Sequence, residues 1–136
     1  MALKAKTYPG VVCLVDTDII IDYLRRREYA LELLTRWAEG GLLAVSGITH
    51  FEVFAGMKIG EEPATSAFLD GIVSVAIDVP IARHAGEMSG RLRAKGMTVG
   101  MADCIIAASA ILLSVPLLTN NVAHYPFSGL ELVRGV

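Results

Sequence analysis

The sequence predicts an α/β domain built around a mostly parallel sheet, and three observations support this prediction. Short apolar runs recur along the 136 residues, and stretches with helical periodicity lie between them. Each run is apolar along its whole length, which is typical of strands whose two faces are covered by helices. Glycine and proline residues separate the successive units. We expect one domain over residues 1–136, because a chain of this length can bury a single core.

The expected strands are five uninterrupted apolar runs. The first reads "VVCLV" and leads directly into acidic residues, whereas the later runs are bounded by glycine or proline. The expected strands cover residues 11–15, 42–46, 72–77, 116–119 and 130–133.

The expected helices fill the stretches between these runs. Leu33, Leu34 and Trp37 share one face of the second helix, and the fifth begins at Pro80 and ends at Gly96. The expected helices cover residues 19–27, 29–39, 49–58, 64–69, 80–96 and 101–113.

Composition excludes several classes of protein. Hydrophobic residues make up 54% of the chain and charged residues 19%, which argues against disorder. The nearly apolar stretch 105–118 is shorter than the roughly 20 residues of a membrane-spanning helix. The N-terminus lacks a convincing cleavage site, so we expect no signal peptide, no membrane association and a cytoplasmic location. Cys13 and Cys104 lie in apolar surroundings, and we interpret them as reduced core residues.

Three acids are predicted to meet at one edge of the sheet. Asp16 ends the first strand, Glu52 lies early in the helix after the second, and Asp103 lies in the first turn of the helix that feeds the fourth. Helices that leave or feed parallel strands in this way begin at the carboxyl edge, where α/β proteins bind ligands.

Each acid also has a structural explanation. Asp18 is expected to be the N-cap of the first helix, and Glu52 and Asp103 could complement helix dipoles. Three carboxylates at one edge repel one another, however, and a hard divalent cation removes that repulsion. The combination therefore favours a metal site.

Four stretches of the chain carry a family resemblance. They read "VDTDIIIDYL", "SGITHFEVFAG", "GMADCIIAASA" and "TNNVAHYPFSGLEL", and together they span nearly the whole chain. In their order and spacing they resemble PIN-domain ribonucleases, in particular the VapC toxins of prokaryotic toxin–antitoxin pairs. The resemblance implies a PIN-like three-layer α/β/α domain with a mostly parallel central sheet of four to five strands.

The resemblance also implies the site residues and the chemistry. Asp16, Glu52 and Asp103 match the acidic active site, and Asn121 matches a fourth position that is Asp in some relatives. Thr119 is expected to support the acids by hydrogen bonding. PIN-domain enzymes cut RNA by metal-assisted hydrolysis. Asp16 and Asp103 would hold Mg²⁺ or Mn²⁺, directly or through water, and Glu52 would orient a water or coordinate the ion through one.

The implied partners are RNA, with transfer RNA or ribosomal RNA as substrate classes, and a VapB-like antitoxin that blocks the site. A homodimer is also expected, as is a larger toxin–antitoxin assembly. The net charge of −2 argues weakly against nucleic-acid binding, but the basic residues gather away from the acids. Arg25–Arg27 and the pair Arg91 and Lys95 are either solvated faces or phosphate contacts. We interpret His124 as structural and Tyr125 as a core or dimer packing residue, with stacking on RNA bases as the alternative.

Two other functions fit parts of the pattern. A haloacid-dehalogenase-like phosphatase would use Asp16 as its nucleophile and Ser46 as its strand-end hydroxyl. That family also needs a suitably placed Lys and a late acidic pair, whereas here the fourth strand ends in "TNN". The second alternative is a catalytically degenerate PIN fold that binds RNA or a protein without cleaving.

Overall fold

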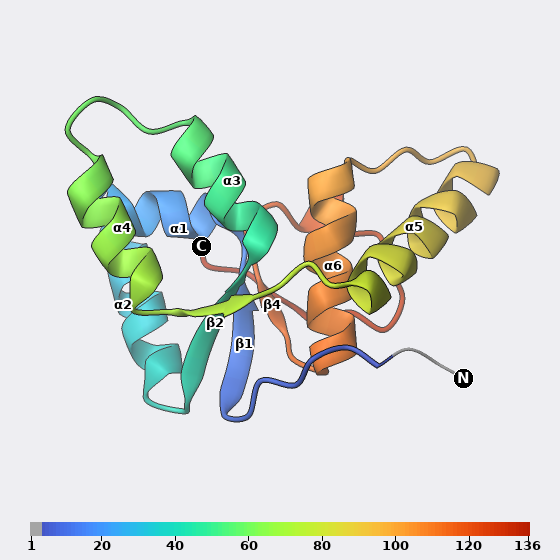
Figure 1. Cartoon of the computed structure of the whole chain (residues 1–136), viewed down its shortest axis with the longest axis horizontal. Coiled ribbons are helices and arrows are strands. Elements are labelled where there is room, and N and C mark those ends of the chain that lie inside the picture. The colour runs from blue at the N-terminus through green and yellow to red at the C-terminus, as the bar shows by residue number, and fades with distance from the viewer. Residues whose placement is uncertain (1–3) are drawn as a thin grey trace.

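The computed structural model describes residues 4–136, which form a central sheet flanked by helices (Figure 1). Elements alternate along the chain as the sequence predicts. In chain order they are β1 (Val11–Val15), α1 (Thr17–Leu24), α2 (Glu28–Ala38), β2 (Leu42–Ser46), α3 (Gly47–Ala55), α4 (Glu62–Asp70), β3 (Val73–Val75), α5 (Val79–Ala94), α6 (Met101–Leu113), β4 (Leu117–Leu118), the 3-10 turn η1 (Val122–His124) and β5 (Leu132–Val133).

The sheet has five strands in the order β3-β2-β1-β4-β5, and every neighbouring pair is parallel. The predicted α/β class is therefore confirmed, with a sheet that is wholly parallel. β1 lies at the centre, where Leu14 pairs with Ala44 on one side and with Leu117 on the other. The carboxyl ends of β1, β2 and β4 consequently lie side by side.

Helices cover both faces of the sheet, with α1 to α4 on one face and α5 and α6 on the other (Figure 1). The alternation of side chains along β1 divides the core in two. Leu14 packs with α5 and α6, whereas Cys13 and Val15 pack with α1 to α4. Both cysteines are buried and free, and burial raises the pKa of Cys13 to about 12. Their predicted place in the core is confirmed.

The first helix begins earlier than predicted. α1 starts at Thr17 rather than Ile19, and its N-cap is Asp16, whose side chain accepts from the backbone N–H of Thr17. The prediction that Asp18 is the N-cap is therefore wrong. Both residues are good capping types, and the local sequence does not show which one lies outside the first turn.

The length and composition of the helices can be compared with those of membrane-spanning helices. Over residues 4–136, every helix falls short of the length and apolar character that a bilayer crossing requires.

Candidate active site

The candidate site lies where β1, β4 and α6 converge. Asp16 follows β1 directly, Thr119 follows β4, and Asp103 lies in the first turn of α6. Because β1 and β4 are parallel neighbours, their ends bring residues 16 and 119 together despite the hundred or so residues between them.

Asp16 is almost fully buried, with 4% of its surface exposed. Its Oδ1 accepts from the backbone N–H of Thr17 at 2.7 Å. Its Oδ2 accepts from the hydroxyl of Thr119 at 2.7 Å and from the hydroxyl of Tyr125 at 2.9 Å. A buried carboxylate needs such donors, since each one offsets part of the cost of removing it from water.

Tyr125 connects Asp16 to Asp103. Its hydroxyl lies 3.2 Å from Asp103 Oδ1, and the other carboxylate oxygen of Asp103 lies 3.5 Å from Nδ1 of the exposed His124. The packing role predicted for Tyr125 is confirmed by its burial, but the sequence predicts neither the contacts of its hydroxyl nor the contact of His124 with Asp103. The tyrosine hydroxyl that follows His124 in "TNNVAHYPFSGLEL" is the signal that could have indicated these contacts.

Glu52 is attached to the site through a different residue. The hydroxyl of Thr17 donates to Glu52 Oε1 at 2.7 Å and lies 2.9 Å from the hydroxyl of Thr49. Since the backbone N–H of Thr17 also donates to Asp16, Thr17 links Glu52 to Asp16.

The three predicted metal ligands share one edge of the sheet but do not form one joint group. Across residues 4–136, no set of three or more His, Cys, Asp or Glu side chains is arranged to hold an ion together. Asp16 and Asp103 contact the same Tyr125 hydroxyl, whereas Glu52 is connected to Asp16 through Thr17. Asn121 is exposed and contributes its backbone N–H to the Thr119 hydroxyl at 3.0 Å.

Asp18 lies beside this pair and faces the chain after β4. Its two oxygens accept from the backbone N–H groups of Ile19 at 2.8 Å and Asn120 at 2.9 Å. Burial, and then the negative charge of Asp16, raise the pKa of Asp18 to about 6. Asp18 therefore joins α1 to the β4 end of the sheet, and it does so at an electrostatic cost.

The charges of the pair suit a cation. Burial, and then the charge of Asp16, raise the pKa of Asp103, and burial and the two acids also raise the pKa of Tyr125. The Tyr125 hydroxyl has one proton, so it can donate to only one carboxylate at a time. Within residues 4–136, neither acid forms an ion pair with Lys or Arg. Mg²⁺ takes oxygen ligands and binds through one or two carboxylates with waters and substrate phosphates, so this donor set fits such an ion.

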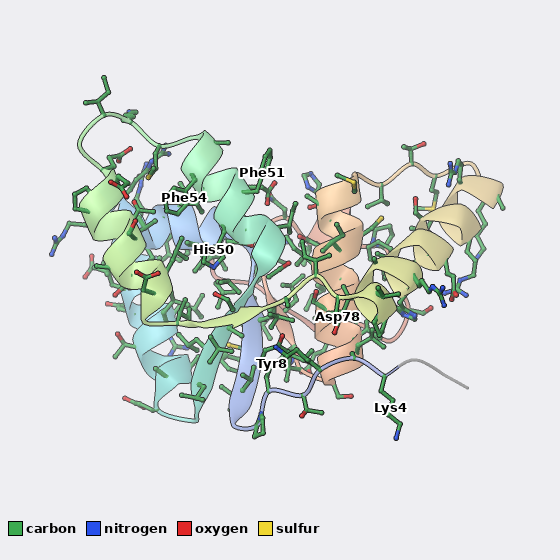
Figure 2. All side chains as sticks on the ribbon, in the orientation of Figure 1. Lys4, Tyr8, His50, Phe51, Phe54 and Asp78 are labelled. Atoms are coloured by element: carbon green, nitrogen blue, oxygen red, sulfur yellow. The ribbon has the colours of Figure 1, made fainter. Side chains whose placement is uncertain are left out.

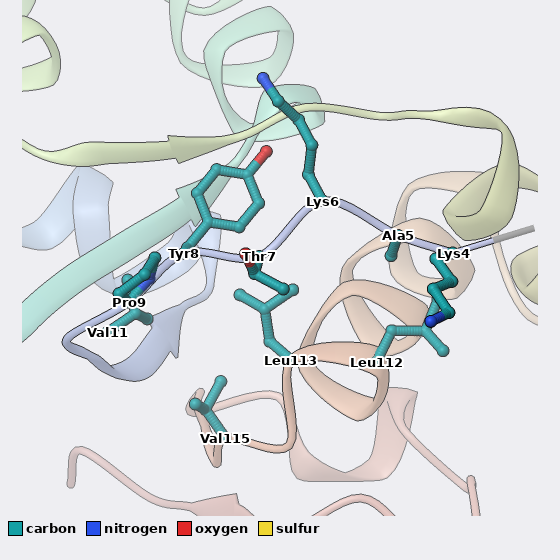
Figure 3. Close-up of a pocket in the computed structure, with 10 residues that line it drawn as sticks. All are labelled: Lys4, Ala5, Lys6, Thr7, Tyr8, Pro9, Val11, Leu112, Leu113 and Val115. Carbon is teal, nitrogen blue, oxygen red and sulfur yellow. The ribbon is translucent and has the colours of Figure 1, made fainter.

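Two cavities differ in their relation to the acids. A cavity of about 320 Å³ opens beside Asp103, between the loop before α6 and η1, and His124 and Pro126 line it. A second cavity, of about 460 Å³, lies between the N-terminal segment and the end of α6 (Figure 3). None of the predicted site residues lines the second cavity, so the cavity beside Asp103 is the one relevant to the site.

Ser46 does not take the position that a phosphatase would require. It is fully buried, and its hydroxyl accepts from the backbone N–H of Ile48 as the N-cap of α3. The hydroxyl therefore serves the helix rather than a substrate phosphate.

Comparison with known proteins agrees with this geometry. The profile of the PIN domain family matches residues 13–126. Ribonuclease VapC19 and Ribonuclease VapC10 of Mycobacterium tuberculosis are each 36% identical to the chain over 114 residues, which are 83% of this chain and 91% and 85% of those proteins.

Solved structures have the same fold. A toxin–antitoxin complex from Klebsiella pneumoniae contains a chain with a TM-score of 0.77 and 28% identity, covering 91% of this chain and 98% of that one. DNA-bound VapBC from Salmonella typhimurium gives a TM-score of 0.82 at 22% identity, covering 93% and 99%. With most of its length matched by the family profile, this chain belongs to the PIN domain family.

Proposed function

We propose that this chain is a metal-dependent endoribonuclease and the toxin of a VapBC-type toxin–antitoxin pair. The observation that carries the proposal is the pairing of Asp16 and Asp103 through Tyr125 at the carboxyl edge of the sheet. The relatives named Ribonuclease VapC supply the class of reaction, since they match more than four fifths of the chain.

The residues would divide the work of cleavage as follows. Asp16 and Asp103 would hold Mg²⁺ or Mn²⁺, which when bound stabilises charge on the scissile phosphate and makes a bound water more acidic. Glu52 would orient the attacking water, or coordinate the ion through a water. The water oxygen bonds to phosphorus as the bond to the 3′ oxygen breaks, which leaves a 5′-phosphate and a 3′-hydroxyl. The cavity beside Asp103 offers room for the RNA.

The structure offers apolar surface for a protein partner. Phe51 and Phe54 lie on α3 with 68% and 38% of their surface exposed (Figure 2). A separate cavity of about 110 Å³, between α1, α3 and the start of α4, is lined in part by Ile21, Val53 and Met57. An antitoxin segment that packs on this apolar surface and directs a basic side chain at the acids would block the site. A homodimer would cover further apolar surface.

Incubation of the purified chain with a panel of RNAs tests this function. We expect cleavage with Mn²⁺ or Mg²⁺ and none with EDTA. Asp16→Asn should lower the rate on the order of 10²–10³-fold, because it removes charge from the metal-binding pair. Arg91→Gln is a useful comparison. If this exposed residue contacts an RNA phosphate, the variant should bind RNA more weakly and with a smaller salt dependence, and its metal requirement should be unchanged.

Three results would contradict parts of the proposal. Cleavage that persists in EDTA would exclude the metal-dependent mechanism. RNA binding without cleavage would favour a degenerate PIN fold, and release of phosphate from small phosphomonoesters would favour the phosphatase.

A further inference from the structure

Tyr125 has no part in the chemistry described so far, although its hydroxyl contacts both acids. The residue is 3% exposed and belongs to the core that α5 and α6 form. Its ring also packs near Phe127, with ring centroids 6.5 Å apart. The position of the hydroxyl is therefore determined by core packing as well as by the carboxylates it contacts.

The hydroxyl joins two acids that come from different layers of the fold. Asp16 follows the central strand and Asp103 belongs to a helix on one face, so backbone pairing alone does not set the distance between their side chains. Like charges at this range repel each other. The Tyr125 hydroxyl lies 2.9 Å from Asp16 Oδ2 and 3.2 Å from Asp103 Oδ1, so its single proton, donated to either carboxylate, offsets part of this repulsion.

We propose that Tyr125 is a positioning residue that holds Asp16 and Asp103 at the spacing a divalent cation needs. The inference rests on the proposed function, because it assumes that these two acids bind the ion. Groups that orient metal ligands through hydrogen bonds typically contribute about 10–100-fold to metal affinity. Phe at this position keeps the ring in the core but removes the donor.

Titration of Mn²⁺ without RNA, with free Mn²⁺ measured by electron paramagnetic resonance, tests this role apart from activity. Tyr125→Phe should weaken Mn²⁺ binding about 10-fold. Tyr29→Phe is the matched control, since the Tyr29 hydroxyl also donates to a carboxylate, that of Asp22, and accepts from Asn120 at 2.8 Å. It touches neither acid of the pair, so Tyr29→Phe should bind Mn²⁺ as the wild type does.

A second measurement gives its first result with the wild-type chain alone, and the two variants then assign the signal to one tyrosine. Saturating Mg²⁺ should change the ultraviolet absorption of tyrosine, because the partners of the Tyr125 hydroxyl become ion ligands. Tyr29→Phe should keep this difference spectrum and Tyr125→Phe should lose it.

The outcomes separate this inference from the proposed function. Wild-type affinity in Tyr125→Phe, or tighter binding, would overturn the positioning role and leave the nuclease proposal standing. An unchanged tyrosine spectrum in Mg²⁺-saturated wild type would also overturn it. Absence of Mn²⁺ binding by the wild type would overturn the metal assignment and this inference together.

Discussion

Asp103 and Glu52 are both connected to Asp16, and the structure makes the two connections through different residues. Asp103 shares the Tyr125 hydroxyl with Asp16, so that one donor lies between two carboxylates. Glu52 accepts from the Thr17 hydroxyl, and only the backbone of Thr17 reaches Asp16. We therefore propose that the connection through Tyr125 lets Asp103 share an ion with Asp16, and that Glu52 acts on this ion indirectly.

The largest expected effect distinguishes Asp103 from Glu52 by the rate of RNA cleavage. Asp103→Asn should lower RNA cleavage on the order of 10²–10³-fold, because it removes half of the charge of the metal-binding pair. Glu52→Gln should cost roughly 10–100-fold, as is typical of a group that acts through an outer-shell contact. Single-turnover cleavage rates at saturating Mn²⁺ provide the comparison. Equal losses of cleavage rate in the two variants would contradict the different roles proposed for Asp103 and Glu52.

A smaller effect concerns the support of Asp16. Thr119→Val removes the donor to Asp16 Oδ2 and the acceptor of the Asn121 N–H. Because Asp16 is buried, we expect the free energy of unfolding to fall by about 1–3 kcal/mol. Urea unfolding measures it, and Thr98→Val, at an exposed threonine in the loop before α6, is the matched control. A change no larger than that of the control would show that the contact does not stabilise the fold.

The smallest expected effect concerns Asp18 and depends on pH. The pKa of Asp18 is about 6 in the folded chain, against about 3.8 ordinarily. At a pH below both pKa values, Asp18 is protonated in the folded and the unfolded chain, so its raised pKa does not destabilise the fold. As pH rises between them, only the folded state keeps the proton, so Asp18 increasingly destabilises the fold and does so fully above about pH 6.

Asp18→Asn removes this penalty. Its stability relative to wild type should therefore improve by about 1 kcal/mol from roughly pH 4.5 to pH 7.5, with solvent screening taken into account. Urea unfolding of metal-free protein at both pH values measures the change, and Asp70→Asn, at an exposed aspartate, serves as the control. A relative stability that stays constant or falls with pH would contradict the account of Asp18.

Much of the fold could be predicted from the sequence, because its determinants are local. The apolar runs predicted for β1 and β2 and the helix over 101–113 have the bounds seen in the structure. Parallel topology then placed Asp16 and Asp103 at one edge. Helix starts were less accurate, because adjacent capping residues such as Asp16 and Asp18 compete for one position.

The parts of the site that could not be predicted depend on side-chain directions. Tyr125 lies in the chain after η1, where no strand or helix periodicity indicates which way its side chain points. Glu52 lies near Asp16 as expected, but its connection through the Thr17 hydroxyl could not be predicted. Helical spacing predicts which face of the helix a residue lies on. It does not predict the side-chain position closely enough to distinguish a shared ligand site from an indirect contact.

The most direct measurement is the Mn²⁺ affinity of Asp16→Asn, Asp103→Asn and Glu52→Gln, each without RNA. If the ion belongs to the residues joined by Tyr125, the two aspartate variants should bind it far more weakly than wild type does. Glu52→Gln should bind nearly as tightly as wild type. Affinity that falls as much in Glu52→Gln as in the aspartate variants would contradict a two-carboxylate site and favour an ion shared by all three acids.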